Sequence, residues 1–161
     1  MTVEEYNNCV DEFSDGIYRF ILKNIRDEDE AQDIVQESYT RMWERVKSIQ
    51  YQKARSYLFT TAYHTMIDRV RKNKRLSSME NTQVHQPQEN NNYSDLSEVL
   101  NRAVDTLPET QKHVVLLRDY EGYSYREIGE ITNLSEAQVK VYIFRARKAL
   151  RHYIGSMDKV I

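Results

Sequence analysis

The chain has 161 residues, of which 40% are hydrophobic and 30% charged, and its net charge is -2. This length allows one domain or two small ones with a real apolar core. No apolar run is long enough for a membrane-spanning helix, and the acidic N-terminal stretch is unlike a signal peptide, so we expect a cytoplasmic protein without direct membrane insertion. A single cysteine, Cys9, excludes an internal disulfide, and we expect it to be buried.

The charges are separated along the chain. Residues 1–34 hold ten Asp or Glu and three Lys or Arg, whereas residues 41–75 hold two acidic and ten basic residues. Such blocks predict different partners for different faces: phosphates for the basic blocks, and either a protein surface or solvent alone for the acidic ones.

Apolar residues three and four positions apart predict a helix from Val3 to Ile25. A second helix is predicted to start in the acidic run Asp27 to Asp33, because negative charge stabilises a helix N-terminus, and to carry apolar residues as far as Ile49. The polar side of this second helix carries Asp33, Gln36, Glu37 and Arg41.

The third predicted helix, about Lys53 to Lys74, has two stripes. One is a core stripe of Ala54, Leu58, Ala62 and Thr65, and the other consists of Tyr57, Thr60, His64, Asp68, Arg71 and Arg75. Aromatic rings beside cations suit unpaired bases and the backbone of opened DNA, and the basic stretch 69–75 suits phosphates. The alternative is that the aromatic residues Tyr57, Phe59 and Tyr63 only fill the core.

Residues 76–95 are rich in Ser, Asn and Gln and show no apolar period, which predicts a flexible linker. The linker separates an N-terminal domain, residues 1–75, from a C-terminal domain, residues 96–161. We therefore expect an all-α protein of two small helical domains, each of modest stability.

After the linker, apolar residues predict a helix from Leu96 to Leu107. Pro108 fits the first position of the next helix, which is expected to end at Gly122 and to carry Arg118 near its end.

Two capping boxes follow, Ser124 with Glu127 and Ser135 with Gln138, so two helices must start about eleven residues apart. Asn133, between them, tolerates the left-handed conformation of a sharp turn. This pattern predicts a helix-turn-helix whose corner is packed by Ile128, Ile131, Leu134 and Val139.

The second helix of this pair has a basic outer side, with five Lys or Arg and no acidic residue from Gln138 to His152. At 100° per residue, Val139, Ile143, Ala146 and Leu150 share the core side. The outer side, which suits phosphates and thymine methyl groups in a major groove, carries Ala137, Val141, Phe144, Arg145 and Lys148, with Lys140, Arg147 and Arg151 on one flank. A merely solvated basic face is the alternative.

Motifs for catalysis or metal binding are missing. The four histidines lie far apart without partners at ligand spacing, and the sequence has neither a Gly-rich phosphate loop nor a nucleophile elbow. We therefore expect no enzyme, no cofactor and no metal site.

Taken in order, these parts resemble a bacterial RNA polymerase sigma factor of the extracytoplasmic-function group of the sigma-70 family. Residues 33–37 with Trp43 resemble the segment that grips the coiled coil of the polymerase beta-prime subunit. Residues 57–59, 62, 67–69 and 71 resemble the segment that melts and reads the minus-ten element. The minus-thirty-five reader is matched by Leu107-Pro108-Glu109, Leu117-Arg118, Tyr120-Glu121-Gly122, Ser124-Tyr125, Glu127-Ile128, Val139-Lys140 and Phe144-Arg145-Ala146-Arg147.

The resemblance implies a protein that binds core RNA polymerase through its beta-prime and beta subunits, recognises both promoter elements and promotes DNA melting. It also implies an anti-sigma factor as a partner. The implied polymerase-binding residues are Asp33, Ile34, Gln36, Glu37 and Arg41. The implied DNA-binding residues are Tyr57, His64, Arg71 and Arg75 in the first domain, and Arg118, Lys140, Val141, Phe144, Arg145 and Lys148 in the second.

Three departures from the family pattern concern DNA-reading positions. Tyr57 stands where the family commonly has Trp, and His64 where it commonly has Asn. Val141 and Tyr142 replace a usual Ser and Arg, which removes one cation. An imidazole offers other hydrogen bonds than an amide, so minus-ten specificity is not transferred from the family.

Two other functions fit parts of the chain. A helix-turn-helix repressor or activator would bind duplex DNA alone, but it leaves the aromatic and basic third helix without a role. A helical adaptor that binds only protein would not depend on the charge of Arg145.

Overall fold

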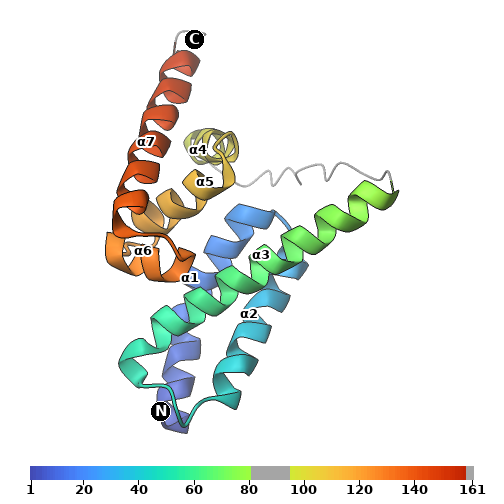
Figure 1. The fold of residues 1–161 in the computed structure, drawn as a ribbon, viewed down its shortest axis with the longest axis vertical. Coiled ribbons are helices and arrows are strands. Elements are labelled where there is room, and N and C mark those ends of the chain that lie inside the picture. The colour runs from blue at the N-terminus through green and yellow to red at the C-terminus, as the bar shows by residue number, and fades with distance from the viewer. Residues whose placement is uncertain (81–94, 159–161) are drawn as a thin grey trace. The chain divides into compact units, whose positions relative to one another are not determined.

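The computed structural model describes residues 1–80 and 95–158, and these ranges contain helices and turns but no β-strand (Figure 1). The chain divides into two compact units, Met1–Gln88 and Glu89–Ile161, each of which is considered by itself. The expected all-α class is confirmed. Among the helices so described, none has the length and apolar character needed to cross a membrane.

The first unit consists of α1 (Val3–Ile25), α2 (Glu28–Glu44), the short 3-10 helix η1 (Tyr51–Lys53) and α3 (Ala54–Glu80). The three α-helices pack against one another, and α3 crosses the other two (Figure 1). Their shared core contains Cys9, as expected, and is filled by Ile17, Phe20, Ile21, Ile34, Met42, Leu58, Phe59 and Met66.

The acidic start predicted for the second helix is confirmed. Asp27 caps α2 by accepting a hydrogen bond from the Glu30 N–H at 3.1 Å. The helix ends earlier than predicted, at Glu44, because the chain turns to i→i−3 hydrogen bonds such as Val46 N–H to the Trp43 carbonyl at 3.2 Å. Val46 and Ile49, which were predicted to belong to this helix, therefore lie in the turns after α2.

The predicted core stripe of the third helix is confirmed, since Ala54, Leu58, Ala62 and Thr65 are all buried. The helix itself is longer than predicted, because residues 76–80 continue α3 into the segment expected to be a linker. The rest of that segment, apart from Asp95 at the start of α4, lies outside the described residues. The domain boundaries 1–75 and 96–161 stay a prediction.

The second unit consists of α4 (Asp95–Asp105), α5 (Glu109–Val115), a π-helical segment (Leu116–Tyr120), α6 (Tyr125–Thr132) and α7 (Glu136–Asp158). The long helix α7 packs against α4, α5 and α6, and so organises this unit. At its core Leu107, Val115 and Ala146 form a buried cluster, against which Leu150 packs.

The helix predicted from Pro108 to Gly122 differs in two details. Pro108 is the N-cap, one position before the first helical residue, with φ -55° and ψ 148°. The α-helix then widens into the π-helical segment, where the Glu121 N–H donates to the Leu116 carbonyl five residues back. Gly122 follows with φ 75°, a left-handed conformation that favours glycine.

The predicted corner between α6 and α7 is confirmed. Asn133 has φ 61° and ψ 39°, and both capping boxes are formed, with hydroxyl acceptors on Ser124 and Ser135. The two helices approach closely, since a Cβ placed on Gly129 would lie 2.7 Å from the carbonyl oxygen of Leu134. Only a residue without a side chain fits there as the backbone stands.

A buried histidine makes the second unit sensitive to acid. Burial lowers the pKa of His113 in α5 from 6.5 to about 4. Between these two values the unfolded chain binds a proton that the folded chain does not, so the free energy of unfolding falls as the pH falls. We expect a loss of roughly 2 kcal/mol between pH 7 and pH 5.

This expectation can be checked by urea denaturation of the full chain at both pH values, followed by circular dichroism. Because carboxylates also titrate in acid, His113→Gln is the matched control, and its loss of stability between pH 7 and pH 5 should be smaller by that amount. An equal loss in both proteins would contradict the assignment.

Candidate nucleic-acid interface

The outer face of α7 is the first candidate surface. Its apolar side chains Val141 and Phe144 are 46% and 63% exposed, and Arg145 and Lys148 are exposed beside them. The opposite side, with Val139, Ile143 and Ala146, is buried as predicted. The predicted division of this helix into a core side and an outer side is therefore confirmed.

A tyrosine from α6 gathers two of the predicted DNA-binding cations. The Arg118 guanidinium lies 4.8 Å from the centre of the Tyr125 ring, and the Lys140 ammonium lies 5.7 Å from it. Arg118 also donates a hydrogen bond of 2.8 Å to the Tyr123 carbonyl. Such contacts hold long cationic side chains in place while other N–H donors stay available for an anion.

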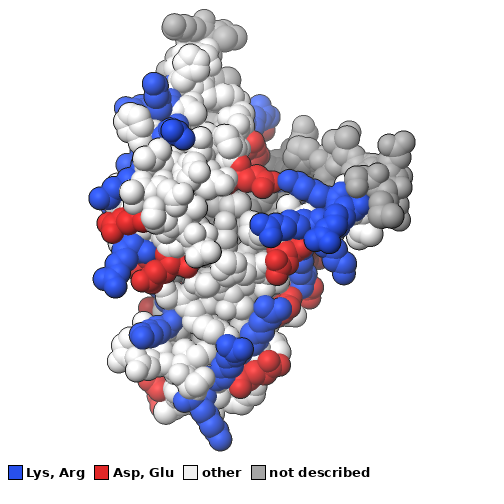
Figure 2. All heavy atoms as spheres, viewed as in Figure 1, with Lys and Arg blue, Asp and Glu red and all other residues white. Residues whose placement is uncertain are grey.

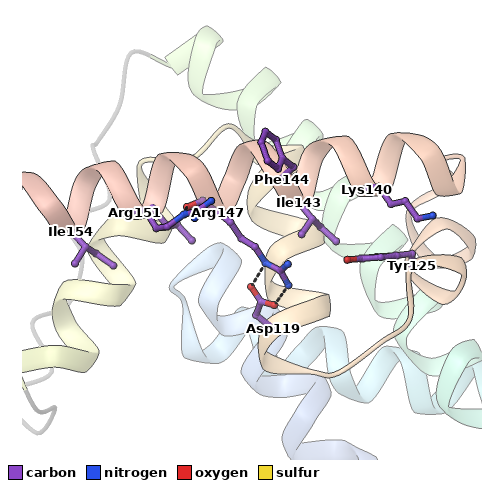
Figure 3. Close-up of a pocket in the computed structure, with 9 residues that line it drawn as sticks. Asp119, Tyr125, Lys140, Ile143, Phe144, Arg147, Arg151 and Ile154 are labelled. Atoms are coloured by element: carbon purple, nitrogen blue, oxygen red, sulfur yellow. Dashed lines mark hydrogen bonds and ion pairs between the residues drawn. The ribbon is translucent and has the colours of Figure 1, made fainter.

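An ion pair ties α7 to the π-helical segment. Arg147 donates two hydrogen bonds to the carboxylate of Asp119, at 2.6 and 3.2 Å (Figure 3). These hydrogen bonds raise the pKa of Arg147, which stays charged. The pair lies in an open groove of about 730 Å³, and Figure 3 shows Ile143 and Lys140 beside Tyr125 there, with the Phe144 ring pointing away from them.

The second candidate surface lies on α3. Tyr57 is half-buried and His64 is exposed, with the His64 ring edge-on to Tyr63 at 5.5 Å between ring centres. Arg71 and Arg75 are exposed further along, where Figure 2 shows Lys and Arg side chains gathered over the C-terminal half of α3. Of Tyr57, Phe59 and Tyr63, the three aromatic residues that could have served only the core, Phe59 alone is fully buried, at 2% exposed.

The predicted polymerase-binding residues occupy the exposed side of α2, with one exception. Asp33, Gln36 and Arg41 are exposed and Glu37 is partly exposed. Ile34 has no exposed surface and packs in the helical core, so it is left out of the surface proposed below.

A cation from α3 joins this acidic surface. Arg69 donates to Asp33 at 2.8 Å and to Glu37 at 2.6 Å, and the second oxygen of Glu37 pairs with Arg41 at 2.8 Å. Partial burial works against the charge of Arg69, but the two carboxylates outweigh it and its pKa is raised. The basic stretch predicted to contact phosphates is thus divided, since Arg69 turns to α2.

Sequence reasoning missed these contacts between distant residues. Asp119 and Arg147 are 28 positions apart, and Arg69 lies 36 and 32 positions from its two partners. None of these three separations leaves a periodic signal, so no local pattern could have identified the pairs. The contact of Tyr125 with Lys140 was missed for the same reason.

Comparison with known proteins gives one family match for each of the two units that carry these surfaces. Residues 9–76 match the family model for sigma-70 region 2, and residues 97–150 match that for sigma-70 region 4. The chain is a sigma-70 factor of the extracytoplasmic-function group. Among its relatives, the ECF RNA polymerase sigma factor SigM of Bacillus subtilis (strain 168) is 29% identical over 159 residues, or 94% of each chain.

A second relative of this sigma factor is RNA polymerase sigma factor SigV of the same organism, which is 29% identical over 153 residues and matched over 93% of this chain and 91% of its own length. Solved structures share the fold. The sigma factor RpoE of Bartonella quintana, crystallised with the anti-sigma factor NepR, superposes with a TM-score of 0.80 at 20% identity, covering 95% of this chain and 98% of RpoE. CnrH, solved with the cytosolic domain of CnrY, superposes with a TM-score of 0.70 at 20% identity, covering 94% of this chain and 88% of CnrH.

The sigma factor therefore acts in transcription initiation, with core RNA polymerase and promoter DNA as partners. The units that carry the two candidate surfaces correspond to the two matched regions. Region 2 contains α3 as far as Leu76 and the acidic side of α2, and region 4 contains the helix-turn-helix.

Proposed function

We propose that this sigma factor binds core polymerase through α2, captures the minus-ten element with α3 and reads the minus-thirty-five element with α7. One observation carries the proposal. Two separate units of one chain each expose a face that combines cations with apolar or aromatic groups, on α3 and on α7. Two such faces suit a protein that contacts a promoter at two points.

The upstream contact is proposed for the outer face of α7. In this proposal the exposed Lys140, Arg145 and Lys148 contact phosphates and base edges, while the exposed Val141 and Phe144 offer apolar surface of the kind that contacts thymine methyl groups. Arg118, held against Tyr125, is proposed to bind a phosphate next to this helix.

The downstream contact is proposed for α3, with the loop before Lys53. Tyr57 and His64 lie seven residues, or two helical turns, apart on one face and would receive an extruded base, with Arg71 and Arg75 on the backbone. Extrusion costs a few kcal/mol, which stacking of roughly 1 to 3 kcal/mol per base can offset.

Polymerase docking is proposed for Asp33, Gln36, Glu37 and Arg41 on α2, facing the coiled coil of the beta-prime subunit. In this scheme the sigma factor works in the cytoplasm, where the polymerase is, and supplies binding and positioning. The proposal assigns no covalent chemistry, cofactor or metal to the sigma factor itself.

The experiment that tests the proposal adds the purified chain to core polymerase freed of other sigma factors, together with a library of promoter DNA. We expect core binding and transcripts with defined start sites. Failure of both would overturn the proposal. Binding to duplex DNA by the chain alone would favour a repressor or activator, and protein binding without any effect of Arg145 would favour an adaptor.

Arg145→Ala should reduce promoter selectivity while core binding is unchanged, because the exposed Arg145 side chain is proposed to touch only DNA. We expect the transcript ratio between a selected promoter and one with a scrambled minus-thirty-five element to fall roughly tenfold. The matched control is Arg102→Ala on α4, which removes another exposed arginine of the same unit. An equal loss of core binding would count against the role of Arg145.

We also propose that an anti-sigma factor controls this chain. Among the solved structures with the same fold, RpoE was crystallised with the anti-sigma factor NepR, and CnrH was solved with the cytosolic domain of CnrY. A partner of this class should abolish core binding when added in equimolar amount, and a protein that binds the chain without affecting core binding would not qualify.

A further inference from the structure

We infer that Arg69 is a positioning residue for polymerase docking: it holds the carboxylates of Asp33 and Glu37 in the arrangement in which core polymerase binds them. The inference rests on the proposed docking role of α2. It assigns to docking a residue of α3 that the sequence placed with the phosphate contacts.

The geometry of the ion pairs carries the first step. Arg69 uses two different nitrogens, Nη1 for Asp33 and Nη2 for Glu37, so one planar guanidinium spans two acidic side chains a helical turn apart. Arg41 takes the other oxygen of Glu37. The result is an alternating row of four charges across α2, in which both carboxylates are held from the side of α3.

The exposure of these side chains carries the second step. Arg69 is 29% exposed, whereas Asp33 is 64% and Glu37 34% exposed. A carboxylate oxygen accepts more than one hydrogen bond, so the contacts with Arg69 leave both Asp33 and Glu37 able to accept further hydrogen bonds. The cation is therefore the more enclosed partner, and the acids keep outward surface for an incoming basic group.

The energetics of docking carry the third step. An isolated glutamate or aspartate on a helix samples several rotamers, and fixing them on binding opposes association. Arg69 imposes that order before the partner arrives. Its contribution to the stability of the unit itself should be small, since ion pairs that stay partly open to solvent stabilise proteins little.

Positioning and simple charge give opposite expectations for Arg69→Gln. Removing a cation makes the surface more negative, which would tighten binding to a basic partner if charge alone mattered. If Arg69 orders the two acids, its loss should weaken binding, and we expect an increase in the dissociation constant of about tenfold.

The test measures the affinity of the full-length chain for core polymerase by competition. Arg69→Gln should bind about tenfold more weakly with an unchanged unfolding midpoint. Arg69→Lys keeps the positive charge but has no guanidinium to bond both acids at once, so its affinity should lie between that of Arg69→Gln and that of the wild type. The matched control is Arg45→Gln, which removes an exposed arginine just after α2 and should bind normally.

The same measurement in an Asp33→Asn, Glu37→Gln background completes the cycle. There Arg69→Gln should have no further effect, because the residue acts through the two acids. Unchanged or tighter binding of Arg69→Gln, or an equal loss in both backgrounds, would overturn the inference. Wild-type affinity of the Asp33→Asn, Glu37→Gln chain would instead refute the proposed docking surface, whatever Arg69 does.

Discussion

Replacing Asp33 and Glu37 together by lysine should weaken binding to core polymerase by roughly 100-fold or more. The exchange alters the charge of the proposed docking surface by four units, and like charges brought together at an interface cost several kcal/mol. With 1.4 kcal/mol for each factor of ten, a loss of this size follows from one or two such contacts. A competition assay with labelled chain and sigma-free core polymerase measures it.

The double exchange also leaves Arg69 facing two lysines, so a fold effect must be separated from a docking effect. Adding Arg69→Glu to the double variant restores opposite charges between α2 and α3 with reversed sign. If the acids bind polymerase, this triple variant should be as stable as the wild type and still fail to bind. Recovery of core binding would show that Asp33 and Glu37 serve only the fold.

A second control matches the size of the charge change. Asp11 and Asp15 are exposed on α1, one helical turn apart, as Asp33 and Glu37 are on α2. Replacing both by lysine changes the net charge equally but leaves the proposed surface intact, so core binding should stay close to the wild-type value. An equal loss would mean that overall charge, and not this surface, governs docking.

Gly129→Val should unfold the helix-turn-helix or displace its turn. The Cβ alone would lie 2.7 Å from the Leu134 carbonyl oxygen, which belongs to the backbone and cannot rotate away. Overpacking of this kind costs about 1 to 3 kcal/mol, and a small unit has little stability to lose. Displacing the turn would also move the start of α7, so promoter binding should be lost. Gly129→Ala should show the same defect in weaker form.

Gly155 provides the matched control on α7. A Cβ there meets nothing within 4 Å, so Gly155→Ala should be neutral or stabilise the helix. Circular dichroism melting of the full chain measures both variants. Trp43, the single tryptophan, lies in the first unit, and its fluorescence transition should be unchanged by either. Wild-type melting and promoter binding of Gly129→Val would contradict the close approach.

Much of the local structure followed from short-range patterns. The capping boxes at Ser124 and Ser135, the left-handed Asn133 and the acidic start of α2 all depend on residues within one helical turn, which a sequence displays directly. The core stripe of α3 and the outer face of α7 follow from helical periodicity alone. The family resemblance rested on the same local motifs and was confirmed by matches to both sigma-70 regions.

Local pattern was less informative where several conformations compete. Two examples are the π-helical segment Leu116–Tyr120 and the early end of α2 at Glu44. Both depend on how the end of the helix packs against the rest of its unit, and no local residue excludes a continued α-helix there. The burial of Ile34 shows the same limit, because a contact residue and a core residue can share one short motif. The roles of the individual site residues remain predictions.

By itself the sequence determined a helical protein with a helix-turn-helix, a basic and aromatic third helix and an acidic second one. Only the tertiary structure decided that Arg69 joins the acidic surface, that Asp119 anchors Arg147 and that Tyr125 holds Arg118 and Lys140. The physical reason is the reach of each interaction. Capping and periodicity act within a few residues, whereas an ion pair between helices depends on how far each helix is rotated toward its neighbour, which packing of the whole unit sets.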